Sequence, residues 1–163
     1  MRGLLSKVIV LAEGLYSSTA PAKYAVALAR AFGTEVLAVY AVDTAAIRHL
    51  SKRRIFIDEE SEEYERSLEE TGRHRLAFVE ELARVKGVRI ETRLLKGSIA
   101  GEVVRLAEES GADCILLGGW EHNRDFRDII MEANREIASL APCSVLFVKN
   151  RDAELAYGNL ADR

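Results

Sequence analysis

The chain has 163 residues, of which 48% are hydrophobic and 30% charged, and its formal net charge is −3. This length and balance are typical of a single globular domain with a buried core. The slightly negative charge argues against nucleic acid and anionic membranes as partners, and no apolar run approaches the roughly 20 residues that span a bilayer. Two cysteines without metal-like spacing favour structural thiols in a reducing, cytoplasmic compartment.

The N-terminal part predicts a strand, a helix and a second strand. Lys7–Ala12 is a continuous apolar, β-branched run, which is typical of a strand buried on both faces of a sheet. Thr19 and Pro21 indicate a helix start, because threonine caps free N–H groups and proline lacks one. Apolar side chains then recur at helical spacing until Gly33 ends the helix. The next buried strand is expected at Glu35–Val42.

Residues 43–57 have no clear hydrophobic period and carry a basic cluster. An acidic run follows from Asp58, which suits a helix N-cap, and acids in a first turn favour the positive end of the helix dipole. This helix should run to about Val85, with a candidate bend at Gly72. We expect the basic cluster to face the acidic run, within the chain or across a dimer, rather than to bind nucleic acid. The basic residues are Arg48, Lys52, Arg53 and Arg54.

The C-terminal part returns to alternating strands and helices. Val88–Leu95 alternates polar and apolar residues, which predicts a strand at a sheet edge. A helix capped by Ser98 leads to a buried strand at Cys114–Leu117, and a second amphipathic helix leads to a last strand at Val145–Val148. We take residues 1–149 as the domain. The polar tail Asn150–Arg163 either frays or docks as a short helix.

Strands and helices in alternation predict an α/β fold: a single, doubly wound parallel sheet of five strands with helices on both faces. Three segments also resemble the universal stress protein family, over about Lys7–Lys149. They are the first strand ending in an acid (VIVLAEG), the stretch KGSIAGEVVRLAEESGADCILLGG, and the closing strand APCSVLFVK. The resemblance implies a Rossmann-like, adenine nucleotide α-hydrolase-like sheet with strand order 3-2-1-4-5. It also implies a homodimer that pairs through the last strand, at Val145, Leu146, Phe147 and Val148.

The ATP-binding members of that family carry the motif G-x2-G-x9-G-[ST] at the end of the fourth strand. Gly118 matches its first position, but Glu121, Met131 and Glu132 stand at the other three. Phosphate cradles need backbone N–H groups that a ligand can approach closely, and glycines provide this approach. Glu121 and Glu132 add negative charge where phosphates would lie, and Met131 adds bulk. The sequence therefore disfavours ATP or AMP as a cofactor.

A nucleotide would otherwise bind in the crevice between the first and fourth strands, where the order of the sheet reverses. Glu13 stands where ATP-binding members have an acid, and Gly97 matches their ribose-side turn. Lys96 and Arg127 are further candidates for contacts with phosphate. The full set of candidate cofactor-binding residues is Glu13, Gly14, Ala41, Val42, Gly97, Gly118, Gly119 and Arg124.

Other functional interpretations of individual residues have less support. The turn after the fourth strand offers one histidine and no metal-ligand spacing, so a metal site at Glu121, His122, Asp125 and Glu132 is disfavoured. No hydrolytic group is expected from Ser17, Ser18, His122 and Glu13, because the serines lie in no G-x-S-x-G turn. Trp120 is a lid over a pocket or, preferably, an interface anchor. Cys114 and Cys143 start neighbouring strands, so both a disulfide and two free thiols stay open.

These observations favour a non-enzymatic, cytoplasmic stress-response or regulatory protein without catalytic or metal-binding residues. It would act through a homodimer and through contacts with an unidentified protein partner. The alternative is an adenine-nucleotide-binding sensor that uses the crevice. An enzyme of the nucleotide-dependent α-hydrolase type is the third reading, and no catalytic constellation supports it.

Overall fold

The computed structural model describes residues 4–12, 19–118 and 127–163. Its centre is a parallel sheet of five strands in the order β3-β2-β1-β4-β5. This arrangement confirms the predicted doubly wound α/β fold and the predicted order 3-2-1-4-5. The strands are β1 Lys7–Leu11, β2 Glu35–Asp43, β3 Glu91–Gly97, β4 Cys114–Leu117 and β5 Ser144–Phe147.

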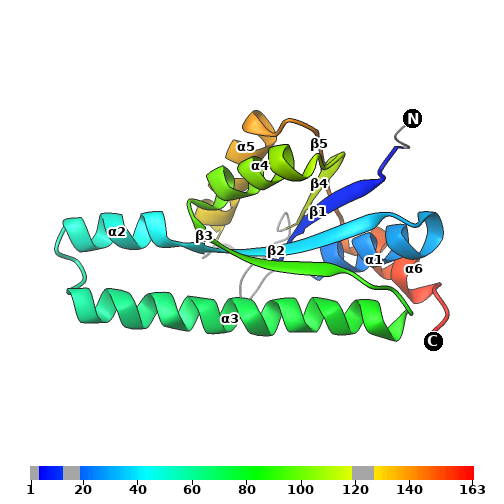
Figure 1. Cartoon of the computed structure of the whole chain (residues 1–163), viewed down its shortest axis with the longest axis horizontal. Coiled ribbons are helices and arrows are strands. Elements are labelled where there is room, and N and C mark those ends of the chain that lie inside the picture. The colour runs from blue at the N-terminus through cyan, green and yellow to red at the C-terminus, as the bar shows by residue number, and fades with distance from the viewer. Residues whose placement is uncertain (1–3, 13–18, 119–126) are drawn as a thin grey trace.

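Helices cover both faces of the sheet. One face carries α1, α3 and α6, and the other carries α4 and α5 (Figure 1). The helices are α1 Ala20–Phe32, α2 Thr44–Lys52, α3 Asp58–Val85, α4 Ile99–Ser110, α5 Arg127–Leu140 and α6 Asn150–Gly158. In the described part of the chain, no helix is both long and apolar enough to cross a membrane.

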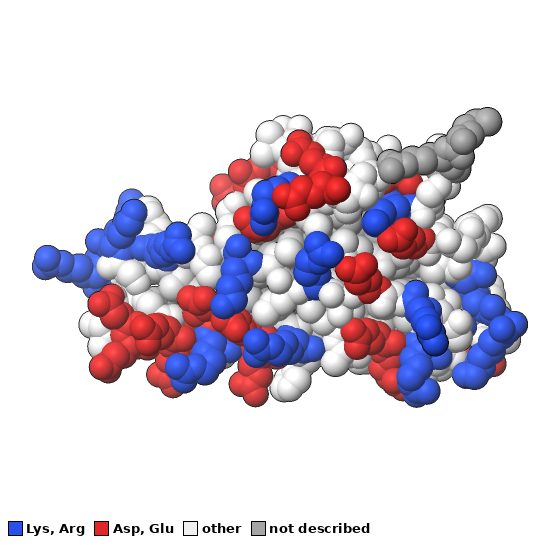
Figure 2. Space-filling model, in the orientation of Figure 1, with Lys and Arg blue, Asp and Glu red and all other residues white. Residues whose placement is uncertain are grey.

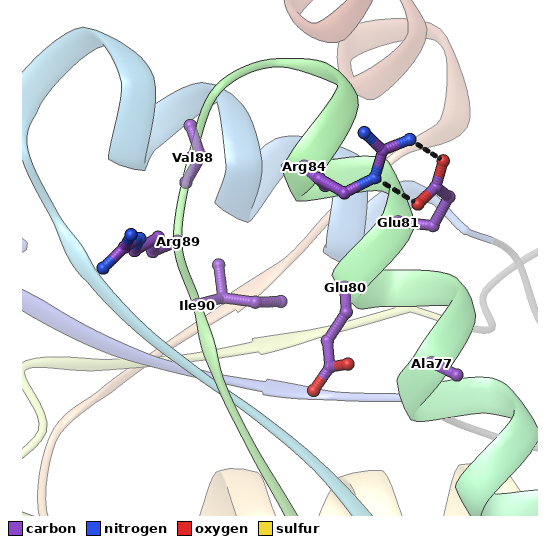
Figure 3. A pocket seen from close by; sticks show the side chains of 7 residues that line it. All are labelled: Ala77, Glu80, Glu81, Arg84, Val88, Arg89 and Ile90. Carbon is purple, nitrogen blue, oxygen red and sulfur yellow. Dashed lines mark hydrogen bonds and ion pairs between the residues drawn. The ribbon is translucent and has the colours of Figure 1, made fainter.

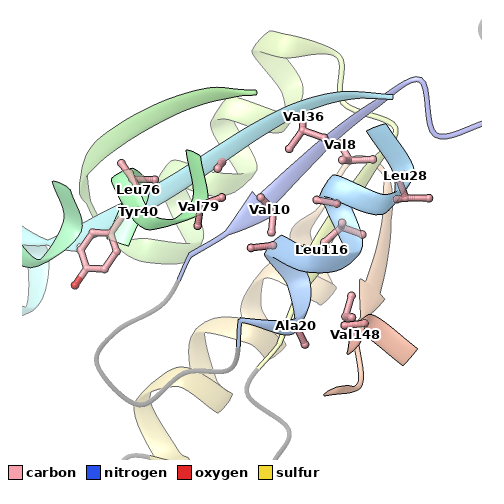
Figure 4. Close-up of a cluster of buried hydrophobic side chains, with 14 of the residues drawn as sticks. Val8, Val10, Ala20, Leu28, Val36, Tyr40, Leu76, Val79, Leu116 and Val148 are labelled. Atoms are coloured by element: carbon pink, nitrogen blue, oxygen red, sulfur yellow. The ribbon is translucent and has the colours of Figure 1, made fainter. Parts of the chain in front are cut away.

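The alternation of side chains along β1 builds two cores. Val8 and Val10 point into a cluster under α1, α3 and α6, which Figure 4 shows in close-up. Ile9 and Leu11 point to the opposite face, into a cluster under α4 and α5. All four side chains are buried, as expected for a central strand of a parallel sheet. The continuous apolar run that predicted this strand therefore reflects burial on both faces.

β3 lies at the edge of the sheet, as its alternating pattern predicted. It pairs with β2 alone, and Glu91 and Arg93 are exposed. The strand begins three residues later than expected and continues to Gly97. The neighbouring helix α3 runs unbroken through Gly72, so the candidate bend is wrong. A Cβ at Gly72 would lie 2.5 Å from Cδ1 of Tyr40, so this glycine lets α3 approach the sheet closely.

The segment that showed no hydrophobic period contains a helix. Asp43 ends β2 and caps α2, with its carboxylate accepting a hydrogen bond from the backbone N–H of Ala46 at 2.9 Å. Ile47 is the buried residue of α2, so the helix lacks the apolar stripe that makes amphipathic helices visible in a sequence. The next helix, α3, is capped one residue earlier than expected. Ile57 is its N-cap, and its N–H donates to the Glu60 carboxylate at 3.1 Å.

The C-terminal tail docks as the helix α6, one of the two outcomes left open by the sequence. It packs against α1, and Ala153 is fully buried. The Tyr157 hydroxyl donates to the carbonyl of Leu82 at 2.9 Å. Lys86, whose ammonium lies 4.8 Å from the centre of the Tyr157 ring, pairs with the Asp162 carboxylate at 2.5 Å. Residues beyond 149 thus complete the core on this face of the sheet.

Candidate functional site

The crevice expected from the topology lies at the carboxyl ends of β1 and β4. These strands are neighbours, with Val10 opposite Leu116, and the sheet is built outward from them in opposite directions. Ligands of open α/β sheets bind at such a switch point. Several predicted residues of this site lie outside the described part of the chain. They are Glu13, Gly14, Gly119, Glu121 and Arg124, together with Ser17, Ser18, Trp120, His122 and Asp125.

Gly118, the first glycine of the motif, is buried where β4 ends. A Cβ at this position would lie 2.7 Å from Cγ of Pro21, in the first turn of α1. Its carbonyl oxygen accepts a hydrogen bond from Nδ2 of Asn134 at 3.0 Å. Close packing of α1 against the end of β4 therefore requires a glycine here, whether or not a ligand binds.

Asn134 is a polar residue of the site that the sequence reading missed. It is 1% exposed, and its Oδ1 has no hydrogen-bond partner among the described residues. Its Nδ2 ties α5 to the end of β4 through Gly118. The signal was in the sequence, because position 134 falls on the apolar stripe of α5, four residues after Ile130 and three before Ile137. A polar residue at a buried position of a stripe indicates a specific partner.

The two other described motif positions lie on α5. Met131 is half-buried and Glu132 is exposed. Glu132 thus carries an exposed carboxylate, and position 131 carries a side chain where the motif has glycine. Their effect on phosphate binding stays a prediction.

Ala41 and Val42 do not form one wall of side chains. Successive residues of a strand point to opposite faces, and Val42 is fully buried in the core cluster under α1 and α3. Ala41 points to the other face and packs against the cluster under α4 and α5. The predicted apolar wall after β2 is therefore divided between the two faces of the sheet.

Lys96, the cation expected to help hold phosphates, is bound to α3. Its ammonium pairs with the carboxylates of Glu65, at 3.3 Å, and Glu69. The hydrogen bond to Glu69, followed by the one to Glu65, raises the pKa of Lys96 above its usual value. The same bond from Lys96 lowers the pKa of Glu69. These ion pairs hold the side chain on the edge of the sheet next to α3.

Gly97 and Ser98 form the turn that starts α4, as predicted. The hydroxyl of Ser98 accepts a hydrogen bond from the N–H of Gly101 at 3.2 Å. Gly97 has a positive φ of 147°, and a Cβ there would lie 2.7 Å from Cγ of Glu102. Glycine is therefore required by the backbone and by the packing of the first turn of α4. Glu102 puts a carboxylate beside the turn.

The cysteines are free thiols, which answers the question of a disulfide. Burial raises the pKa of the Cys114 thiol to about 11 and also raises the pKa of Cys143. Within residues 4–12, 19–118 and 127–163, no group of three or more His, Cys, Asp and Glu side chains is arranged to hold a metal ion.

A groove of about 400 Å³ lies away from the crevice, between the end of α3 and the segment that leads into β3 (Figure 3). Two of its four charged side chains pair with each other, and a third accepts a hydrogen bond from a neighbouring hydroxyl. Glu81 binds Arg84 through two hydrogen bonds of 2.7 and 2.6 Å, and the hydroxyl of Thr92 donates to Glu80 at 2.6 Å. The crevice is the better candidate site, because ligands of open α/β sheets bind at the switch point of the strand order.

Comparisons with known proteins agree with the fold and with the family resemblance. The model of the universal stress protein family matches residues 5–149. The universal stress protein MJ0531 of Methanocaldococcus jannaschii is 30% identical over 151 residues, which cover 93% of this chain and 86% of that protein.

Solved structures of universal stress proteins share the fold at lower identity. One, a crystal structure in complex with cAMP, is 18% identical with a TM-score of 0.65 and covers 90% of this chain and 99% of its own. Another, from Archaeoglobus fulgidus in complex with dAMP, is 18% identical with a TM-score of 0.61 and covers 90% of this chain and 100% of its own. At this identity the likeness concerns the fold.

Proposed function

The chain belongs to the universal stress protein family, and on that basis we propose that it is a non-enzymatic, cytoplasmic stress-response protein that does not bind ATP. In this proposal it acts as a homodimer and through contacts with a protein partner. The proposal concerns the mode of action, because the family fixes the fold and the general role in stress response.

The state of Lys96 carries the first part of the proposal. A triphosphate needs several donors and cations, and Lys96 is already neutralised by Glu65 and Glu69 of α3. Recruiting it would take this cation from Glu65 and would leave Glu69 with Arg73 as its ion-pair partner. Glu132 adds a further exposed carboxylate on α5, so the described charges around the site disfavour a polyphosphate.

The position of β5 at the end of the sheet supports the homodimer. Among the described strands β5 has β4 as its one neighbour, and natural sheets usually cover such an edge strand. Leu146 is 38% exposed on one side of this strand, and Val145 and Phe147 are half-buried on the other. Val148 lies in the core at 6% exposure, so the proposed interface consists of Val145, Leu146 and Phe147 without it.

Thermal unfolding with nucleotides tests the absence of ATP binding. A ligand present at 100 times its Kd stabilises a protein by about 2.7 kcal/mol, which for a chain of this size raises Tm by roughly 5–10 °C. We expect no shift with about 1 mM ATP or ADP (an order-of-magnitude choice for ligands of roughly 10 μM affinity). A shift of several degrees would refute the proposal.

A reconstruction of the motif tests the reason for the missing affinity. The triple variant Glu121→Gly, Met131→Gly and Glu132→Ser should gain measurable ATP binding, because it restores the glycines of the phosphate cradle. The matched control changes the same three positions to alanine, which removes charge and bulk without the glycine backbone. If neither variant gains affinity, the motif is not what excludes ATP.

Sedimentation analysis of single variants tests the homodimer. Leu146→Glu puts a charge at the proposed interface and should convert the dimer into a monomer. Leu155→Glu is the matched control, because Leu155 is also exposed but lies on α6. A dimer that survives Leu146→Glu would place the interface elsewhere.

The second candidate is a sensor of adenine nucleotides with a single phosphate. The observation that favours it is that solved universal stress proteins are in complex with cAMP and with dAMP. A nucleotide with one phosphate needs fewer backbone N–H contacts than ATP does. The three substituted motif positions are therefore a weaker argument against its binding. Binding of cAMP or AMP without binding of ATP in the same thermal assay would favour this function over the first.

A further inference from the structure

α2 and the adjoining part of α3 form a helical hairpin, residues 44–65, that extends beyond the sheet. Figure 1 shows it on the left, past the ends of β2 and β3. Ile47 is the buried residue of α2, and α2 contacts α3 and β3. Most of the hairpin surface is therefore available to a partner.

The two arms of this hairpin carry opposite charges. The basic arm ends α2 and the acidic arm begins α3, and all their side chains are exposed. Figure 2 shows the basic side chains gathered at the end of α2 and the acidic ones below them at the start of α3. The basic arm is Arg48, Lys52, Arg53 and Arg54, and the acidic arm is Asp58, Glu59, Glu60, Glu62 and Glu63.

Neither arm is neutralised by the residues that the structure describes. None of these nine side chains forms an ion pair with another residue of the described part of the structure. Farther along α3 the charges do pair, as Glu69 with Arg73 and Glu81 with Arg84. The expectation that the basic cluster faces the acidic run is therefore not met by ion pairs inside one chain.

An apolar tip separates the arms. Ile55 is 59% exposed and Ile57 63% exposed, although both are large aliphatic residues. Between them, Phe56 packs against the ring of Tyr64, with ring centres 5.7 Å apart. An apolar centre with a charged rim is the usual anatomy of a protein interface. Helix dipoles account for cations at the end of α2 and acids at the start of α3, but they do not account for the exposed isoleucines.

Hydrogen bonds brace the tip of the hairpin. Arg54 has a positive φ of 56°, and its N–H donates to the carbonyl of Ser51 at 2.9 Å. The N–H of Ile55 donates to the carbonyl of Leu50 at 3.0 Å, which completes the two-bond helix ending that normally uses glycine. The hydroxyls of Ser51 and Ser61 lie 2.5 Å apart and join the two helices. A fixed surface loses little conformational freedom on binding.

We propose that this hairpin is a self-association surface that binds the same hairpin of a second copy of the chain. About a twofold axis, the basic arm of each copy faces the acidic arm of the other, and the isoleucines of both tips meet at the centre. An interface about a twofold axis must be self-complementary. A surface that carries a basic arm and an acidic arm meets this requirement, because each arm can face the opposite charge on the second copy. A nucleic acid or another anionic polymer would meet the acidic arm, and a basic partner would meet the basic arm.

Charge reversal on one arm at a time provides the test. The first variant carries Arg48→Glu, Lys52→Glu and Arg53→Glu, which leaves Arg54 as the remaining cation of that arm and gives the hairpin two acidic arms. The second carries Glu59→Lys, Glu62→Lys and Glu63→Lys, which outnumber the remaining Asp58 and Glu60 and give the hairpin two basic arms. Each should self-associate at least about tenfold more weakly than the parent, because favourable pairs become repulsive. A 1:1 mixture should regain the parent affinity to within about threefold, because each arm again meets its opposite. Circular dichroism of each variant establishes that it is folded.

The measurement is sedimentation velocity over a range of concentrations, in a Leu146→Glu background that removes the association proposed for β5. In this background a failure of the hairpin proposal is distinguishable from a failure of the homodimer through β5. Raising NaCl from about 50 to about 500 mM should weaken the association by about tenfold. Ile57→Ser should weaken it as well. The matched control Phe32→Ser should not, because Phe32 is also an exposed large apolar residue but lies at the end of α1.

Three results would overturn the proposal. One is a parent chain that stays monomeric in this background up to about 300 μM, where even a weak interface with a Kd near 1 mM begins to show. Another is a pair of folded charge variants that associate as strongly as the parent. The third is a mixture of the two variants that stays as weak as either alone, since that would exclude contact between opposite arms.

Discussion

Replacing Gly72 by alanine should destabilise the protein, although the same change stabilises most helices. In a helix interior, Gly→Ala normally gains about 1 kcal/mol. Here the new Cβ would lie 2.5 Å from Cδ1 of Tyr40 and 2.7 Å from Cδ1 of Leu94. Both atoms must move by roughly 1 Å to reach ordinary contact, and overpacking of this kind costs about 1–3 kcal/mol. With two side chains to displace, we expect the upper end of this range and a net loss of about 2 kcal/mol.

Urea unfolding followed by circular dichroism at one fixed protein concentration measures this change. A net loss of about 2 kcal/mol corresponds to a decrease in Tm of roughly 4–8 °C for a chain of this size. Gly158→Ala is the matched control, because Gly158 also lies in a helix, as the last residue of α6, and a Cβ there would have no neighbour within 4 Å. The control should be neutral or slightly stabilising. If Gly72→Ala is as stable as the parent, α3 does not approach β2 and β3 as closely as described.

Three further predictions follow from charges and thiols. Glu69 has a lowered pKa, so the stability that its ion pairs contribute is present above its usual pKa of about 4.5 and is lost as the pH falls through its lowered pKa. Lys96→Met should reduce this loss of stability in acid, measured as the free energy of unfolding from pH 7 to pH 3. Cys114 and Cys143 have raised pKa values, so a thiol reagent at pH 7.5 should label the folded chain far more slowly than the chain in urea, and equal rates would contradict the burial. Arg54→Gly removes a left-handed non-glycine residue and should raise the free energy of unfolding by about 1 kcal/mol while it weakens hairpin association; a loss of stability would contradict the described turn.

The sheet was predictable because its strands are encoded locally. Continuous apolar runs mark strands buried on both faces, as at Val8 to Leu11, and alternation marks the edge strand that contains Glu91 and Arg93. The helix α2 was not predictable in the same way, because Ile47 alone supplies its buried face. The available signal was Asp43, a capping residue placed where the strand ends.

The candidate site depended more on tertiary contacts. Lys96 pairs with Glu65 and Glu69, which precede it by 31 and 27 residues. No pattern in the local sequence predicts that α3 lies beside β3. Lys86 likewise pairs with Asp162, 76 residues away, so the docking of the tail could not be read from the tail alone. Asn134 is the exception, because a polar residue within an apolar stripe could have been recognised from helical spacing.

The glycines of the motif have different meanings once their neighbours are known. Gly118 is held against Pro21 and Gly97 against Glu102, so both are required by packing, and neither is an argument for a retained nucleotide. Gly118→Ala should therefore destabilise the chain in the absence of any ligand, which thermal unfolding without nucleotide would measure. Within the motif this chain departs from the ATP-binding pattern at positions 121, 131 and 132, where no glycine or serine stands. The first glycine of the motif therefore does not separate a chain that binds ATP from one that does not, because the fold needs that glycine for its own packing.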